Sequence, residues 1–375
     1  MPDSQRLEHL LAHCRTGHPT LAGPTAVGGP PRTMVTPTAS ALRPSPAAGP
    51  AAALGTVLVA NRGEIAIRIC RACSELGIQT VAVYAEDDAQ SLHTKKADVA
   101  VPLTGAGFGA AAYLNQEALL AAAAANGCRA VHCGYGFLSE NADFVAACED
   151  AGLVFIGPPS TAISLFGDKT RARALAQELG VALLPGTVSP VTLAEARDFF
   201  ASLGGEPMMI KALAGGGGRG MRTVFSADEL EDAYERCCSE AVAAFGDGAV
   251  FVEKLMVKPR HIEVQVLADG QGGVTHLFER ECSIQRQNQK LIEIAPSPSL
   301  PPGLRSSLLE DAVKLVSAAN YKSAATVEFL VDREMTEDSS FAFMEVNPRL
   351  QVEHTVTEGE AARAPCQDFA CCPSR

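Results

Sequence analysis

The sequence predicts an α/β protein whose first domain is built on a parallel sheet. The apolar run at residues 56–60 is typical of a buried strand. The amphipathic pattern at residues 65–76 is typical of a helix, and Gly77 is placed to cap its carboxyl end. A second apolar run at residues 80–84 completes a β-α-β unit, which requires parallel strands. The alternation of apolar runs and helical patterns continues through residues 130–132 and 153–157.

Length, charge and hydropathy exclude several classes of protein. The chain has 375 residues, enough for about two to three domains. Its formal net charge of −12 leaves no broad cationic surface for nucleic acid, and no stretch approaches the ~20 continuous apolar residues of a membrane span. The turn after residues 56–60 lacks the Gly-x-Gly-x-x-Gly spacing, so a dinucleotide-binding motif is excluded. The cysteines lack the spacing of a zinc site and are expected to be buried free thiols.

Residues 1–54 differ in composition from everything that follows. They are rich in Pro, Ala, Gly and Thr and lack a periodic apolar pattern, so we expect a disordered, linker or targeting segment. Arginine outnumbers acidic residues there and lysine is absent, as in an organelle transit peptide. The expected location is therefore cytoplasmic, or mitochondrial or plastid if the segment is a transit peptide.

The pattern of predicted strands and helices changes after about residue 184. Strands are predicted at residues 207–211 and 250–254, and a helix at residues 226–244. Ser226 and Glu229 have the spacing of a capping box at the start of that helix. Polar and apolar residues alternate at residues 261–267, which predicts a half-buried strand.

A run of four glycines at residues 215–218 is the strongest local signal. Without side chains, backbone N–H groups can surround phosphate oxygens, and the loop can move as a lid. A flexible linker has the same composition. The run lies between two predicted strands and close to Lys211, Arg219 and Arg222, and this context favours a nucleotide lid.

Two carboxylates and one amide predict a metal site. Glu328 interrupts an apolar strand, and Glu is rarely buried without a partner. Glu345 and Asn347 are two residues apart in a second strand, so they share a face. Oxygen atoms on neighbouring strands suit Mg²⁺ that carries nucleotide phosphates.

The segment after Asn347 could hold a small oxyanion. If it is extended, Arg349, Gln351 and Glu353 project together while Leu350 and Val352 face the other way. A guanidinium, an amide and a carboxylate can bind an anion beside a general base. Taken alone, the segment favours a plain amphipathic strand over an anion site. Taken alone, Lys169 and Lys290 are surface lysines and His261 is a half-exposed strand residue.

In combination, these segments resemble the biotin carboxylase family over residues 56 to 358. The matching motifs are VANRGEIA at residues 59–66, GYGFLSEN at 134–141, GDK at 167–169, the glycine run with RGMR at 219–222, RHIE at 260–263 and EVNPRLQVEH at 345–354. The resemblance implies a Rossmann-like pre-ATP-grasp domain at residues 55–170. It also implies an ATP-grasp fold at residues 171–358, with a glycine-rich lid subdomain at about 185–255 and an incomplete α+β subdomain at its carboxyl end.

The resemblance also assigns a reaction and its ligands. It implies a ligase that forms carboxyphosphate from ATP and bicarbonate and carboxylates biotin on a separate carrier, with Mg²⁺ (or Mn²⁺) as the metal. ATP would contact Lys169, Lys211, Gly217, Gly218, Glu253, Lys254, Leu255, Met256, His261 and Asn288. Glu328, Glu345 and Asn347 would hold the metal. Bicarbonate would contact Lys290, Arg349, Gln351, Val352 and Glu353, with Glu353 as the base and Arg349 and Lys290 as catalytic cations.

The implied partners are a biotin carboxyl carrier protein or domain, a carboxyltransferase component and a possible second copy of the chain; nucleic acid and membrane are not expected. The final acceptor stays open among acetyl-CoA, propionyl-CoA, methylcrotonyl-CoA, pyruvate and urea. No Met-Lys-Met biotinylation site is found.

The sequence departs from the family at three places. Asn288 stands where many relatives have His, and Cys133 replaces a usual Pro. Residues 359–375 do not follow the family pattern, so we expect a truncated chain. The alternatives are therefore a truncated, inactive ATP-binding fragment, or another ATP-grasp ligase such as the carbamoyl phosphate synthetase large subunit.

Overall fold

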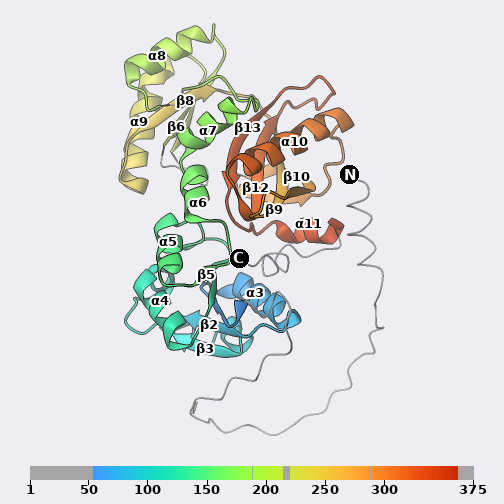
Figure 1. The fold of residues 1–375 in the computed structure, drawn as a ribbon. Coiled ribbons are helices and arrows are strands. Elements are labelled where there is room, and N and C mark those ends of the chain that lie inside the picture. Colours follow the sequence, from blue (N-terminus) through green and yellow to red (C-terminus); the bar gives the residue numbers. More distant parts are fainter. Residues whose placement is uncertain (1–53, 188, 214–219, 287–288, 362–375) are drawn as a thin grey trace. The chain divides into compact units, whose positions relative to one another are not determined.

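The computed structural model describes residues 54–187, 189–213, 220–286 and 289–361, which form sheets of five, three and five strands (Figure 1). The predicted segment 1–54, except Leu54, and most of the tail 359–375 lie outside the described residues. Among the described residues, no helix is both long enough and apolar enough to span a membrane.

The first sheet is parallel, as predicted, with the strand order β3-β2-β1-β4-β5. Its strands are β1 (Val57–Val59), β2 (Thr80–Tyr84), β3 (Val99–Pro102), β4 (Ala130–His132) and β5 (Val154–Phe155). The helices are α3 (Gly63–Glu75), α4 (Gln116–Ala125), α5 (Ala142–Asp150) and α6 (Ser160–Gly167), with short 3-10 turns η1 (Glu86–Asp88), η2 (Leu92–Lys95) and η3 (Gly109–Leu114). Gly77 has a φ of 71° just after α3, which confirms the predicted carboxyl-terminal cap.

Both faces of this sheet are buried, which explains why its strands are continuous apolar runs. Val57 and Val59 pack with Ile65 and Ile69 of α3. Leu58, between them in β1, packs on the opposite face with residues of α4 and α5. The sheet is thereby held between two layers of helices (Figure 1).

The second sheet is antiparallel and carries the predicted glycine segment between two of its strands. It consists of β6 (Met208–Ala212), β7 (Met221–Val224) and β8 (Val250–Lys254), in the order β7-β6-β8. Helices α8 (Leu193–Ser202) and α9 (Ala227–Phe245) pack against it. Since β6 ends at Ala212 and β7 begins at Met221, the glycine run at residues 215–218 connects paired strands; the run itself lies outside the described residues.

The predicted capping box at α9 is wrong. Ser226 is the N-cap residue, but its side chain makes no capping hydrogen bond. Glu229 instead accepts a hydrogen bond from the backbone N–H of Phe225 at 3.2 Å, one residue earlier than the box requires. The capping box that the structure does contain begins α8, where Thr192 and Glu195 satisfy each other's backbone N–H groups.

The third sheet has the order β11-β10-β9-β12-β13, and each neighbouring pair is antiparallel. Its strands are β9 (Arg260–Asp269), β10 (Val274–Arg286), β11 (Gln289–Ile294), β12 (Lys322–Val331) and β13 (Phe341–Asn347). Helices α7 (Lys169–Glu178), α10 (Pro302–Ala318) and α11 (His354–Ala361) accompany it. Side chains of α7 and α10 form one core with the apolar face of this sheet.

Residues 261–267 form a strand as predicted, but the prediction that it is half-buried is wrong. Strand β9 alternates as expected, yet Glu263 and Gln265 are fully buried together with Ile262 and Val264. The polar face of β9 contacts other polar side chains of the sheet in place of solvent. An alternating pattern cannot distinguish water from a buried polar site.

The thiols behave as predicted. All eight cysteines among the described residues are free, and seven of them are buried. The pair Cys70 and Cys73 lies on the face of α3 that packs on the first sheet, so its spacing reflects helix packing.

Candidate active site

One cleft of about 1000 Å³ collects every predicted site residue that the structure describes. These residues are Lys169, Lys211, Glu253, Lys254, Leu255, Met256, His261, Lys290, Glu328, Glu345, Asn347, Arg349, Gln351, Val352 and Glu353. Gly217, Gly218 and Asn288 lie outside the described residues. The same cleft has apolar lining from Met209, Phe251, Leu330 and Met344, which suits the flat ring of a nucleotide base.

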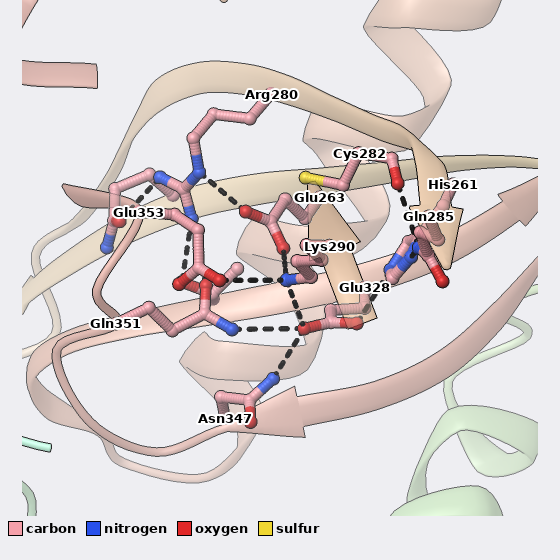
Figure 2. Close-up of polar contacts among 12 residues, drawn as sticks. His261, Glu263, Arg280, Cys282, Gln285, Lys290, Glu328, Asn347, Gln351 and Glu353 are labelled. Carbon is pink, nitrogen blue, oxygen red and sulfur yellow. Dashed lines mark hydrogen bonds and ion pairs between the residues drawn. The ribbon is translucent and has the colours of Figure 1, made fainter. Parts of the chain in front are cut away.

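The predicted metal residues meet across two neighbouring strands. Glu328 of β12 is directly opposite Glu345 of β13 in the antiparallel register, and Thr326 is opposite Asn347. Asn347 donates a hydrogen bond from Nδ2 to Oε1 of Glu328 at 2.8 Å (Figure 2). Burial and the charge of Glu328 raise the pKa of Glu345. Two carboxylates that repel each other, together with the Asn347 oxygen, fit a hard divalent cation.

Glu328 also forms a buried pair with His261. His261 donates from Nε2 to Oε2 of Glu328 at 2.6 Å. Burial would raise the pKa of Glu328, but the His261 hydrogen bond and the charge of Lys290 hold it below its usual range. Burial would lower the pKa of His261, but the contact with Glu328 raises it. The carboxylate therefore stays ionised in the interior, and His261 is not the half-exposed residue that its pattern alone suggested.

Two lysines approach the cleft from different elements. Lys169 begins α7, and burial lowers its pKa although Glu345 acts in the opposite direction. Lys211 of β6 forms an ion pair with Glu253 of β8, and Arg173 of α7 contacts the same carboxylate at 3.2 Å. Two lysines close together are suited to a polyanion such as a triphosphate.

A β-bulge aims Lys290 into the cleft. Gln285 pairs with Lys290 but Ile284 pairs with Ile292, so Leu291 is an extra residue in β11. Leu291 is exposed, whereas Lys290 lies close to the Glu328 carboxylate at 3.3 Å. Burial would lower the pKa of Lys290, but Glu328 and Glu263 raise it, so the ammonium group stays charged. It is therefore not the surface lysine that its isolated pattern suggested.

The segment 349–353 is not an extended strand, so the expected alternation is wrong in part. Strand β13 ends at Asn347, and α11 begins at His354 after a turn. Leu350 is buried in the core as expected, but Val352 is 51% exposed and lines the cleft. The turn still brings Arg349, Gln351 and Glu353 to the cleft wall.

Hydrogen bonds fix the polar groups of this turn. Arg349 donates from Nη2 to Oδ1 of Asn347 at 3.1 Å and forms an ion pair with Glu140, which follows β4 of the first sheet. Gln351 donates from Nε2 to Oε1 of Glu328 at 3.0 Å, and Glu353 Oε1 lies 3.8 Å from the Lys290 ammonium (Figure 2). The Glu353 carboxylate thus lies next to the Lys290 ammonium, as a base that acts on a bound anion requires.

The sequence patterns missed two buried residues that lie behind the cleft lining and contact it. Glu263 of β9 and Arg280 of β10 are fully buried and hydrogen bonded to each other at 2.6 Å. Glu263 also forms an ion pair with Lys290. Three consecutive charged residues, Glu279-Arg280-Glu281, stand between apolar or buried neighbours and could have indicated a buried polar cluster. The same three residues would also fit an exposed strand.

Two sequence families match the chain. Residues 53–163 match the family described as biotin carboxylase, N-terminal domain. Residues 168–362 match the family described as carbamoyl-phosphate synthase L chain, ATP binding domain. The two matches are consecutive and together include the whole cleft.

Proteins of known identity are similar over the same range. The mitochondrial pyruvate carboxylase of Mus musculus is 55% identical over 303 residues, which cover 80% of this chain and 25% of that protein. The chain therefore spans about a quarter of the length of the curated relatives it matches.

Solved structures share the fold. The biotin carboxylase of Campylobacter jejuni in a β-γ-ATP complex has a TM-score of 0.81 and 41% identity, over 85% of this chain and 71% of that one. The biotin carboxylase domain of Hydrogenobacter thermophilus 2-oxoglutarate carboxylase has a TM-score of 0.80 and 44% identity, over 85% and 70%. The latter was solved with MgADP, ADP and bicarbonate.

Proposed function

Because the chain belongs to the biotin carboxylase family of ATP-grasp enzymes, we propose that it catalyses the ATP-dependent carboxylation of biotin with bicarbonate. The observation that carries this proposal is the position of Glu353 beside Lys290, in the same cleft as the paired carboxylates Glu328 and Glu345. A base for a small anion is thereby next to a site for a metal–nucleotide.

Bicarbonate binds between Lys290 of β11 and Arg349 of the turn. The Lys290 ammonium, which stays charged, and the Arg349 guanidinium hold its oxygens, and Gln351 and Val352 complete the pocket. Glu353 removes the proton from the bicarbonate hydroxyl. The resulting oxyanion attacks the γ-phosphorus of ATP, the bond to ADP breaks, and carboxyphosphate forms.

Other residues that line the cleft hold the nucleotide. Lys169 and Lys211 contact the phosphates, and Glu253 to Met256 border the base. The glycine run, which lies outside the described residues, would serve as the lid. Glu328, Glu345 and Asn347 would hold Mg²⁺ or Mn²⁺, which offsets phosphate charge during transfer. A closed lid excludes water, which would otherwise hydrolyse carboxyphosphate.

The carboxyl group then passes to biotin. Carboxyphosphate breaks down to CO₂ and phosphate, the phosphate takes the N1′ proton of biotin, and N1′ then forms its bond to CO₂ on a carrier protein or domain. A carboxyltransferase component completes the reaction with one of the acceptors named above. These partners, and a second copy of the chain, belong to the proposal.

A steady-state assay of the full 375-residue chain tests the activity. We expect ATP hydrolysis that requires bicarbonate and increases with free biotin, and we expect Glu353→Gln to abolish the bicarbonate-dependent part. ATP binding without turnover would favour an ATP-binding fragment. Formation of carbamoyl phosphate from ammonia would favour the carbamoyl phosphate synthetase reaction.

A further inference from the structure

Arg280 is a fully buried arginine at the centre of the polar face of the third sheet. Each of its five N–H groups has an acceptor within hydrogen-bond distance. The acceptors are Glu263 Oε1 at 2.6 Å, Gln265 Oε1 at 2.9 Å, Thr357 Oγ1 at 2.7 Å, Thr326 Oγ1 at 3.3 Å and Gln351 Oε1 at 2.9 Å. The guanidinium thereby joins β9, β10, β12, α11 and the turn that carries the proposed base (Figure 2).

Glu263, one of these acceptors, links Arg280 to Lys290 electrostatically. Glu263 uses Oε1 for Arg280 and Oε2 for Lys290, so one carboxylate is shared by two cations. Burial would lower the pKa of Arg280, but Glu263 raises it, and the arginine stays charged. Because Arg280 neutralises part of the Glu263 charge, the Lys290 ammonium keeps a net attraction for an anion.

A second acceptor connects Arg280 to the bicarbonate pocket through geometry. Gln351 accepts from Arg280 Nη2 with Oε1 and donates to Glu328 Oε1 with Nε2. Both ends of the Gln351 amide are therefore hydrogen bonded. The arginine donor requires the amide oxygen on its side and the carboxylate requires the NH₂ group on the other, so the orientation of the amide is fixed. Without the guanidinium, the amide loses one of the two partners that fix its orientation.

We propose that Arg280 is a positioning residue that sets the affinity of the cleft for bicarbonate by orienting Gln351 and by sharing Glu263 with Lys290. This proposal rests on the proposed function and extends it to a residue outside the cleft lining. None of the hydrogen-bond partners of Arg280 is a residue proposed to contact ATP, so Arg280 acts on bicarbonate with little effect on the nucleotide.

The test uses the full chain with the substitution Arg280→Lys, which keeps the charge but cannot reach five acceptors. We expect the KM for bicarbonate to rise about tenfold or more, as for the loss of a residue that orients a ligand, while the KM for ATP changes by less than about twofold. Thr357→Val is the matched control, because it removes one acceptor of Arg280 that has no contact with the pocket. We expect Thr357→Val to leave both KM values within about twofold of the unchanged chain.

A crystal structure of Arg280→Lys supplies a readout that requires no turnover. We expect Gln351 to be displaced or its amide to be rotated, with Glu263 drawn closer to Lys290. If the unchanged chain hydrolyses no ATP with bicarbonate, the proposed function fails, and the position of Gln351 in the variant still decides the role of Arg280.

The proposal is overturned if the two KM values rise together, if Thr357→Val has the same effect as Arg280→Lys, or if Gln351 keeps its place in the variant. If Arg280→Lys does not fold, Glu263→Gln answers the same question, since it removes the shared carboxylate charge and keeps its shape. An unchanged bicarbonate KM in Glu263→Gln would then contradict the proposal.

Discussion

Glu328 and Glu345 lie opposite each other on adjacent antiparallel strands, with both carboxyl groups at the wall of one cleft. Glu328 is compensated by His261, Lys290, Asn347 and Gln351, whereas burial and the charge of Glu328 raise the pKa of Glu345. The Glu328 charge is thus already balanced by neighbouring groups, whereas the Glu345 carboxylate would be stabilised by a bound cation. This asymmetry leads to the first prediction.

Substitution of Glu345 by Gln should reduce metal-dependent ATP turnover by about a hundredfold, because the amide keeps the shape of the side chain but loses a charged metal ligand. The free energy of unfolding of the metal-free chain should not decrease, since the substitution removes repulsion from Glu328. Turnover at several Mg²⁺ concentrations and urea unfolding in EDTA measure the two effects.

Glu310→Gln serves as the control for this substitution, because Glu310 is exposed on α10. Glu310→Gln should change neither the metal-dependent ATP turnover nor the free energy of unfolding. A Glu345→Gln chain with unaltered Mg²⁺ dependence would remove Glu345 from the metal site.

The sequence was sufficient to predict that Glu328 and Glu345 come together, because a Glu within the apolar run of β12 has few structural explanations. Glu345 and Asn347 followed from the two-residue period of a strand. The parallel first sheet could also be predicted from the sequence, because its strands are apolar on both faces and its crossovers are helical.

Burial of the polar face of β9 could not be predicted in the same way. Glu263 and Gln265 alternate with apolar residues as exposed side chains do, and only β10, through Arg280, determines that the face is buried. The β-bulge at Leu291 and the turn at residues 349–353 also depend on pairing across the sheet. Such features are set by tertiary contacts that a local pattern does not contain.

A second prediction concerns the buried ion pair of Arg173 and Glu253, whose side chains are 6% and 7% exposed. Arg173→Met should lower the free energy of unfolding by about 3 kcal/mol, because Glu253 loses one of two cations in a buried place. Lys211 still contacts the carboxylate and limits the loss. Urea unfolding gives the value.

The exposed pair Arg197 and Glu231, at 55% and 59%, provides the comparison. Arg197→Met should cost less than about 1 kcal/mol, since solvent screens that pair. Equal losses in the two variants would show that burial does not decide the strength of these pairs.

A third prediction concerns thiol chemistry. Cys238 is partly exposed, whereas Cys133 and Cys282 are buried and their pKa values are raised by burial. Among the cysteines that the structure describes, iodoacetamide at pH 8 should modify Cys238 first in the native chain and all of them after denaturation. Peptide mass spectrometry measures this order. Rapid native labelling of Cys282, or a disulfide between Cys70 and Cys73, would contradict the structure.

The fourth prediction concerns the pH dependence of stability through His132 at the end of β4. Burial, with a smaller contribution from His354, lowers the pKa of His132 to about 4, and its Nδ1 accepts a hydrogen bond from the Gly134 N–H at 2.9 Å. The imidazole is thus neutral in the folded chain at pH 5.5. In the unfolded chain, where the pKa is about 6.5, it is mostly protonated at that pH.

Because the unfolded state binds more protons between these two pKa values, the contribution of His132 to stability is complete above about pH 6.5 and decreases as the pH falls toward 4. Between pH 7.5 and pH 5.5 the loss should be about 1.3 kcal/mol. Asn in place of His132 cannot titrate, and its side-chain oxygen can accept from Gly134. The free energy of unfolding of wild type should therefore decrease by about 1.3 kcal/mol more than that of His132→Asn over this interval. Parallel pH dependences in the two chains would mean that His132 binds its proton equally in the folded and unfolded states.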